Sequence, residues 1–217
     1  MSRSSVKAAS AQRSNRVAFT GHYTRAVSAP ATRAAHLMRR GLRQRAPVGY
    51  DAHMETVEIR AYRESDWPAV WAIIQRVVAA GETYAYDPAW TEEQTRGVWV
   101  EPPPGHTVVA CAGARVLGTA KMGPNRPGPG AHVATASFMV AEEARGRGVG
   151  HALGEYALAW ARAHGYAAMQ FNAVVETNTA AVRLWQVLGF RIIGTVPEAF
   201  THPTRGRVGL HIMHRYL

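Results

Sequence analysis

A glycine-rich run, Arg145-Gly146-Arg147-Gly148-Val149-Gly150, lies between an apolar stretch that ends at Val140 and an amphipathic stretch that begins near Val149. This order predicts a strand that turns through the run into a helix. Glycine lets backbone N–H groups approach a ligand closely, the helix contributes the positive end of its dipole, and two arginines add charge. The run therefore fits a loop that binds a polyphosphate, and taken alone it fits a basic surface turn equally well.

The positive charge of the chain is concentrated near its beginning. The 217 residues have a formal net charge of +10, but residues 1–53 hold ten Lys or Arg and one acidic residue. The remainder has fifteen basic and fourteen acidic residues. A nucleic-acid enzyme needs its basic surface on the folded part, so this distribution argues against a nucleic-acid partner.

Two further features bear on where the protein works. No apolar run reaches the length of a transmembrane helix, so we expect no membrane partner. Cys111 is the only cysteine, and its apolar neighbours Val109 and Ala110 predict a buried thiol in a reducing compartment. We therefore expect a cytoplasmic protein.

Residues 1–53 are rich in Ser, Ala and Arg and lack sustained apolar periodicity, which predicts a disordered basic leader. Three explanations compete for it: a transit peptide, a basic tail for polyanions, or a non-native extension with translation starting at Met54. We favour the last, because the ordered pattern begins directly after Met54. The folded domain is predicted to span residues 54–217.

From Val57 onward the hydrophobic pattern predicts strand, two helices, three strands, helix, strand, helix and two strands, an α/β (α+β) arrangement. Ser65 or Asp66 is predicted to cap the first helix, with Pro68 in its first turn. The last two strands are predicted at 192–196 and 210–216, with a loop between them.

The predicted strand at 168–174 carries two polar residues on one face. Gln170 and Asn172 lie opposite Met169 and Phe171, because side chains alternate along a strand. Such residues on a buried strand need partners or a ligand. Asn178 or Thr177 is predicted to cap the helix that follows.

The order of elements and two motifs resemble the GNAT superfamily of acetyl-CoA-dependent N-acetyltransferases, across essentially all of residues 54–217. The first motif resembles the family's pyrophosphate loop, and Arg145, Gly148 and Gly150 match its characteristic positions. The second resembles its later motif, in which Asn178 opens a helix that ends in Gly189-Phe190. The run 169–175, followed by Asn178, further resembles a branch that acetylates small amino or imino acids, including toxic proline analogues.

The resemblance implies a fold and a mode of cofactor binding. The fold is a mixed, mostly antiparallel central sheet of about seven strands with flanking helices and one splayed strand pair. The pantetheine arm of acetyl-CoA would lie in the splay against the backbone of Phe138, Met139 and Val140, with the Val140 amide facing the developing oxyanion. Asn178 would hold the same arm. The pyrophosphate would bind N–H groups of Arg145, Gly146, Arg147, Gly148, Val149 and Gly150.

Trp185 departs from the family pattern, because many members have there a tyrosine that protonates the departing sulfur. An indole N–H does not do this near neutral pH. A thiolate whose conjugate acid has a pKa of about 8.5 leaves readily without full protonation. Trp185 is therefore expected to pack against the cofactor arm or the core, and Tyr84 is a candidate replacement for the acid.

Two polar residues are candidates for handling the acceptor. In this architecture the loop after the first helix roofs the acceptor pocket, so Glu82 is the candidate base, acting directly or through a water. The alternative is a solvated surface carboxylate. Asn172 is a candidate to hydrogen-bond a substrate carboxylate or the acetyl carbonyl, and its alternative is a satisfied amide in the sheet.

We expect an enzyme that transfers acetyl from acetyl-CoA to the amine of a small molecule, with an amino or imino acid as the candidate acceptor, by direct attack in a ternary complex. Its alternatives are a peptide or protein amine as acceptor, or a non-catalytic acyl-CoA-binding module. No metal is expected, because His211 and His214 point to opposite faces of one strand and no Cys or acidic cluster completes a ligand set. A homodimer is left open.

Overall fold

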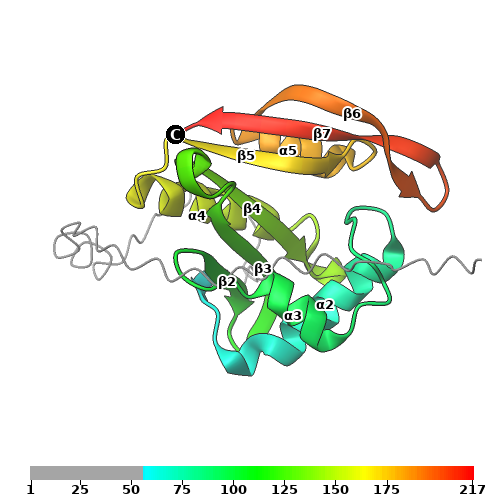
Figure 1. Cartoon of the computed structure of the whole chain (residues 1–217). Coiled ribbons are helices and arrows are strands. Elements are labelled where there is room, and N and C mark those ends of the chain that lie inside the picture. The colour runs from blue at the N-terminus through cyan, green and yellow to red at the C-terminus, as the bar shows by residue number, and fades with distance from the viewer. Residues whose placement is uncertain (1–55) are drawn as a thin grey trace, which may run out of the picture. The chain divides into compact units, whose positions relative to one another are not determined.

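The computed structural model describes residues 56–217, so the leader predicted for 1–53 lies outside the described residues. Seven strands form one sheet in the order β1-β2-β3-β4-β5-β7-β6 (Figure 1). The strands are β1 Glu58–Ala61, β2 His106–Ala112, β3 Arg115–Pro124, β4 Val133–Val140, β5 Ala168–Val175, β6 Arg191–His202 and β7 Gly206–Tyr216. Only β4 and β5 pair in parallel, which confirms the predicted mixed, mostly antiparallel sheet.

In the described part of the chain, four α-helices flank the sheet. They are α2 Trp67–Ala80, α3 Glu92–Trp99, α4 Val149–Ala163 and α5 Thr179–Val187, with short 3-10 turns η1 Glu64–Asp66, η2 Gly128–Gly130 and η3 Glu142–Ala144. A Cβ on Gly118 of β3 would lie 3.1 Å from Val149 Cγ1 in α4, whereas Trp99 Nε1 in α3 donates to Thr119 Oγ1 over 3.0 Å. Since neighbouring strand residues face opposite sides, α4 and α3 cover opposite faces of the sheet. In residues 56–217 no helix is both long and apolar enough to cross a membrane.

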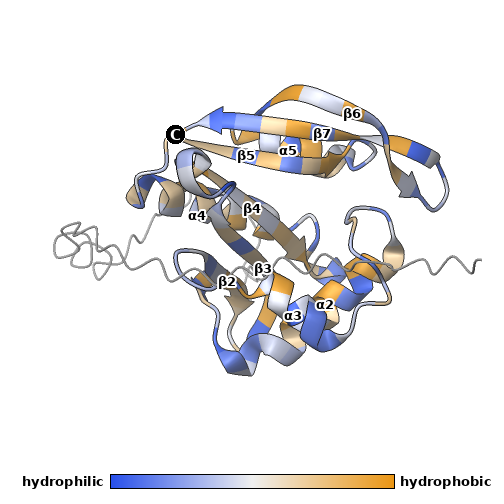
Figure 2. Ribbon diagram, in the orientation of Figure 1, coloured by the Kyte–Doolittle hydropathy of each residue, from blue (hydrophilic) through white to orange (hydrophobic). Residues whose placement is uncertain are grey.

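The helix α2 forms because its apolar residues recur at helical spacing. Trp67, Val70, Ile74 and Val77 are all buried, and apolar residues mix with polar ones along the helix in Figure 2. The helix ends where Gly81 takes a left-handed conformation at φ 65°, which glycine adopts without steric cost. The loop that then leads to α3 is the one predicted to roof the acceptor pocket.

α4 and α5 pack closely against each other. A Cβ on Gly154 of α4 would lie only 2.5 Å from Leu188 Cδ1 and 3.1 Å from Trp185 Cζ3, so a side chain there would force these residues to shift. A Cβ on Gly150 would lie 3.3 Å from Leu184 Cδ2 of α5. The first turn of α4 is thereby held beside α5.

Asp66 does not cap α2 with its side chain, which corrects the prediction. Its carboxylate accepts two bonds of 2.7 Å from the Arg60 guanidinium and one of 2.8 Å from Arg63 N. A charged, bidentate partner is stronger than a neutral helix N–H. Asp66 therefore ties β1 to the beginning of α2.

The last two strands are longer than predicted, so most of residues 197–209 is a hairpin and not a loop. Pro197 interrupts the sequence pattern of a strand, but β6 is an edge strand, where a missing N–H is tolerated. The pairing with β7 shifts between Val196 and Phe200, and Glu198 has φ 52° within that irregularity. The hairpin brings Pro203 to 3.9 Å from a Cβ placed on Gly81.

Replacing Asp66 tests the tie between β1 and α2. Its hydrogen bonds with Arg60 hold the pKa of this carboxyl below its ordinary value. The stabilisation is therefore present above the unfolded-state pKa of about 3.9 and is lost as the pH falls through the lower folded-state pKa. Asp66→Asn should lower the free energy of unfolding by roughly 1–3 kcal/mol at pH 7.

Urea unfolding at pH 7 and at pH 3 checks this prediction, with Glu64→Gln as the control. Glu64 forms an exposed ion pair with Arg96, so its loss should cost less than about 1 kcal/mol. The deficit of Asp66→Asn should shrink at the lower pH. An equal deficit at both pH values would contradict the assignment.

Candidate active site

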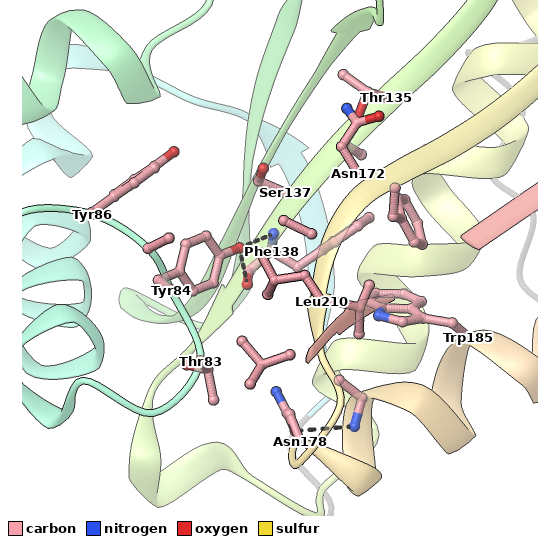
Figure 3. A pocket seen from close by; sticks show the side chains of 17 residues that line it. Thr83, Tyr84, Tyr86, Thr135, Ser137, Phe138, Asn172, Asn178, Trp185 and Leu210 are labelled. Carbon is pink, nitrogen blue, oxygen red and sulfur yellow. Dashed lines mark hydrogen bonds between the residues drawn. The ribbon is translucent and has the colours of Figure 1, made fainter. Parts of the chain in front are cut away.

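The central strands β4 and β5 part soon after they begin to pair. Their parallel pairing is confined to Val133 with Ala168 and Ala134 with Met169. Beyond these pairs a cavity of about 240 Å³ lies between the two strands, the α2–α3 loop, α5 and β7 (Figure 3). The splayed pair that the family resemblance implies is therefore present.

The Tyr84 hydroxyl fills the place of a missing strand partner in this gap. It donates to Phe138 O over 2.7 Å and accepts from Phe138 N over 2.8 Å (Figure 3). Burial raises the pKa of the Tyr84 hydroxyl, so it stays protonated at neutral pH. Tyr84, from the α2–α3 loop, thus satisfies both backbone polar groups of a residue on β4.

The same contact shows which residues of β4 direct their backbone N–H and C=O groups into the gap. In an antiparallel strand, both backbone polar groups of a residue point to one neighbour, and successive residues alternate. Phe138 faces the gap, and Val140, two residues on, faces it as well. By the same alternation the backbone groups of Met139 are directed to β3, as those of Ala141 are, whose N donates to Leu117 O over 2.9 Å. A contact of Met139 with the pantetheine arm stays a prediction.

The glycine-rich run forms the predicted turn from strand to helix. After β4 and η3, Arg145 is extended, Gly146 has φ 73° and Gly148 has φ 81° as the residue before α4. Arg145, Gly146, Arg147 and Gly148 are all exposed. Within residues 56–217 no side chain caps α4, so the N–H groups of its first turn can donate to an anion.

The glycines of this run serve different purposes. A Cβ on Gly146 or Gly148 would meet nothing within 4 Å, so these two provide backbone conformation and open space. A Cβ on Gly150 would lie 3.8 Å from Val140 Cγ2, besides its contact with α5. The loop at the helix N-terminus therefore adjoins the gap beside β4, with Val149 buried beneath it.

Asn178 and Trp185 come to the cavity from α5. Asn178 Oδ1 accepts from Ala181 N over 3.2 Å as the cap of α5, and the residue also lines the cavity. The predicted cap is confirmed, and it leaves the Nδ2 group for other partners. The buried ring of Trp185 lies 4.7 Å from that of Phe138 and 4.8 Å from that of Phe171, between ring centroids, so it packs as part of the cavity wall.

Asn172 lines the open end of the cavity, beside Thr135 in Figure 3. It is exposed, and both ends of its amide are engaged. Its Nδ2 donates to Asn125 Oδ1 over 2.6 Å, and its Oδ1 accepts from Gln170 Nε2 over 2.8 Å. These bonds orient the amide at the cavity mouth, so a ligand would have to share or replace them.

Glu82 lies in the α2–α3 loop, as predicted, but it is exposed and does not line the cavity. Thr83, the next residue, does. Every described side chain that lines the cavity is uncharged. The cavity therefore offers hydroxyl and amide groups to a ligand, and Glu82 would reach it only from the rim.

The thiol of Cys111 lies outside the cavity. Cys111 is buried in β2, as predicted, and burial raises the pKa of its thiol. It does not line the cavity. Within residues 56–217 no three His, Cys, Asp or Glu side chains are grouped closely enough to hold a metal ion.

Three hydroxyl residues of the cavity were not singled out from the sequence. Thr135 and Ser137 come from β4, and Thr83 comes from the α2–α3 loop. The signal for the first two was the alternation of polar residues along an otherwise apolar strand. Nothing in the sequence pattern distinguished Thr83 from an ordinary loop residue.

Comparisons with known proteins identify relatives of this arrangement. A sequence model of the Acetyltransferase (GNAT) family matches residues 58–190. The solved structure of a GCN5-related N-acetyltransferase from Kribbella flavida is 61% identical, with a TM-score of 0.73. That match covers 74% of this chain and 98% of the Kribbella chain.

Two curated relatives match over shorter stretches. Protein SPT10 from Saccharomyces cerevisiae is 37% identical over 83 residues, which is 38% of this chain and 13% of that protein. N-acetyltransferase aca1 from Schizosaccharomyces pombe is 33% identical over 84 residues, which is 39% of this chain and 40% of that protein. The chain thus matches less than half the length of either curated relative.

Removing the Tyr84 hydroxyl should destabilise the protein. Tyr84→Phe leaves the N–H and C=O of Phe138 without their partner, which should lower the free energy of unfolding by about 1–3 kcal/mol. Tyr86→Phe is the matched control, because Tyr86 lines the same cavity and no hydrogen bond of its hydroxyl is found in the described part of the chain. Equal denaturant midpoints for the two variants would refute this role of Tyr84.

Proposed function

Since this chain belongs to the acetyltransferase (GNAT) family of acetyl-CoA-dependent acyltransferases, we propose that it transfers acetyl from acetyl-CoA to the amine of a small molecule. The observation that carries the proposal is the parting of β4 from β5 directly before the glycine-rich loop. Backbone groups of β4 that have no partner strand thus adjoin the N-terminus of α4. A thioester attached to a polyphosphate has acceptors that match both places: its carbonyl oxygen would face the backbone of β4, and its phosphates would face the N-terminus of α4.

The proposed donor site runs from the loop to the gap. The N–H groups of Gly146, Gly148, Val149 and Gly150 would bind the pyrophosphate, with the helix dipole adding attraction. Arg145 N and Arg147 N already donate to Glu142 O and Ala144 O, so these two residues would contribute their side chains. The pantetheine arm would follow β4 past Val140, and Asn178 would hold it from α5 through the amide group that its capping bond leaves available. Trp185 would pack against this arm as part of the cavity wall.

The proposed reaction is direct attack in a ternary complex. The amine nitrogen bonds to the acetyl carbon, the carbon–sulfur bond breaks, the sulfur leaves as a thiolate and the nitrogen loses a proton. The Val140 N–H, directed into the gap, would stabilise the negative charge that develops on the carbonyl oxygen. A CoA thiol with a pKa of about 8.5 leaves without an acid at Trp185. The buried Cys111 takes no part.

The attacking amine must lose its proton before or during attack. The protonated Tyr84 hydroxyl does not serve as the base, because burial raises its pKa. We propose that Glu82, at the rim beside Thr83, accepts the proton through a water. Thr83 and Ser137 line the cavity, and their hydroxyls would orient that water.

A small acceptor fits the cavity better than a polypeptide. The volume is about 240 Å³, and the hairpin of β6 and β7 meets the end of α2 at Pro203 and Gly81. The carboxylate of an amino or imino acid would find neutral donors at Thr135, Ser137 and Asn172. The alternatives are a peptide or protein amine, and a module that binds acyl-CoA without catalysis.

We also propose the setting in which this domain works. The acetyltransferase domain is proposed to span residues 54–217, and the family match at 58–190 lies within it. A cytoplasmic location is proposed from the single, buried thiol of Cys111. Whether the domain acts alone or as a homodimer does not alter the proposed chemistry, because every group named above comes from one chain.

Substituting Gly148 tests the loop. Gly148→Val should raise the dissociation constant for acetyl-CoA at least about tenfold, because a β-branched residue at φ 81° disturbs the N–H groups that face the phosphates. Gly165→Val is the matched control, with φ 77° after the other end of α4 and equally open space. Calorimetric titration should show loss of affinity in the first variant alone. Unchanged affinity in a folded Gly148→Val protein would disprove the loop assignment.

A panel of acceptors tests the activity. We expect CoA release from acetyl-CoA with at least one small amine among amino and imino acids, polyamines and aminoglycosides, and little release with peptides of five or more residues. Mass spectrometry should find the acetylated amine in equal amount to the CoA. Tight binding of acetyl-CoA without release for any amine would favour the non-catalytic alternative.

A further inference from the structure

A second cavity lies between α2 and the loop that leads to α3. Its volume is about 170 Å³, and it shares one wall, Tyr86, with the candidate active site. Its aromatic lining comes from Trp71 of α2 and from Tyr86 and Trp90 of the loop. None of the functions proposed above uses this cavity.

The cavity is built by one helix face and one turn. Trp71, Ile74, Gln75 and Val78 line it at the spacing of a single face of α2. Opposite them is a turn in which Trp90 N donates to Asp87 O over 3.1 Å, with Pro88 at the second position, which suits its fixed φ.

The turn also fixes the carboxylate and the indole at the cavity. Asp87 Oδ1 accepts from Ala89 N over 2.9 Å, which holds the carboxylate against the turn. The ring of Trp90 is tilted against that of Tyr86 at 5.2 Å between centroids. Trp71 stacks on Trp67 at 6.2 Å, so its ring is supported from within α2. Three aromatic side chains thus line a single space together with Asp87, which is exposed and whose carboxylate is held by the turn at its edge.

The surroundings of this cavity are acidic in a basic chain. Among the described residues that line it, Asp87 is the only charged side chain. Residues 82–101 hold five carboxylates and one basic residue, Arg96. Arg96 is paired with Glu64 and lies over the ring of Trp67 at 5.6 Å, and the exposed Arg76 of α2 is not part of the lining. The local charge therefore attracts cations.

We propose that this second cavity binds a small organic ammonium ion. Aromatic faces attract a desolvated cation through their quadrupoles, and the alkyl groups around the nitrogen gain from apolar contact with the same rings. Asp87 supplies the opposite charge. A neutral or anionic ligand of the same shape gains nothing from the carboxylate, so this lining discriminates by charge.

Choline and its neutral carbon analogue 3,3-dimethylbutan-1-ol provide a direct test. The two molecules have nearly the same shape and differ in the charge at the quaternary centre. Calorimetric titration of the full chain, without acetyl-CoA, should show choline binding to one site at least about tenfold more tightly than the alcohol. Equal affinities, or no binding of choline, would overturn the proposal. Neither outcome depends on acetyl transfer, so a failure here leaves the proposed enzyme activity untouched.

Three variants locate the bound choline. Asp87→Asn and Trp90→Leu should each weaken choline binding at least about fivefold. Glu93→Gln is the matched control, because it removes a nearby exposed carboxylate that does not line the cavity. Circular dichroism establishes that each variant is folded. An equal loss of affinity in Asp87→Asn and Glu93→Gln would show attraction by the general charge and would refute the site.

The ammonium group can belong to a separate ligand or to the far end of an amine acceptor, and one kinetic measurement distinguishes these sources. Choline is added to an assay with an acceptor that the chain acetylates. A rise in the acceptor's KM that Asp87→Asn abolishes identifies the distal group of the acceptor as the occupant. An unchanged KM identifies a separate cation.

Discussion

The parting of β4 from β5 is the constraint on which the rest of the site depends. Two pairs of residues join these strands, and beyond them the backbone of β4 has no strand partner on that side. Buried backbone groups left unpaired destabilise a fold, so such a gap requires either a substitute partner or a ligand. Tyr84 is the substitute at Phe138, and a thioester is the ligand proposed for Val140.

The helices are arranged around this gap by close approach. Glycine at positions 150 and 154 lets α4 lie against α5, which brings the cap residue Asn178 and the ring of Trp185 to the cavity. Positive φ at Gly146 and Gly148 turns the chain sharply from β4 into α4. As a result, backbone donors at the start of α4 adjoin backbone donors of β4, and the described side chains that line the cavity are all uncharged.

Local patterns in the sequence predicted much of this structure. Helical and strand periodicity gave the order of the elements, and the glycine-rich run and Asn178 were placed at the correct helix starts. The apolar neighbours of Cys111 predicted its burial. These features are local, because propensity, capping and alternation act over a few residues.

What the sequence did not predict depends on contacts between distant residues or on competition between partners. Tyr84 and Phe138 are separated by 54 positions, so no local pattern marks their contact. Asp66 was expected to cap a helix, but Arg60 supplies a stronger partner. A loop was predicted between residues 196 and 210, but β6 continues through Pro197, since an edge strand does not need the N–H that proline lacks. The aromatic cavity beside Asp87 becomes visible only when α2 and the turn are brought together.

Amide NMR of the full chain, titrated with acetyl-CoA, tests the central claim most directly. The account predicts that the largest changes in amide shift lie at Val140, at the amides from Gly146 to Gly150 and at Asn178, with little change along β1 and β2. The account would be contradicted if the amide shifts of Val140 and Gly148 were unaffected at saturation and changes of that size appeared only in other parts of the chain. The parted strands and the glycine-rich loop would then not form one donor site.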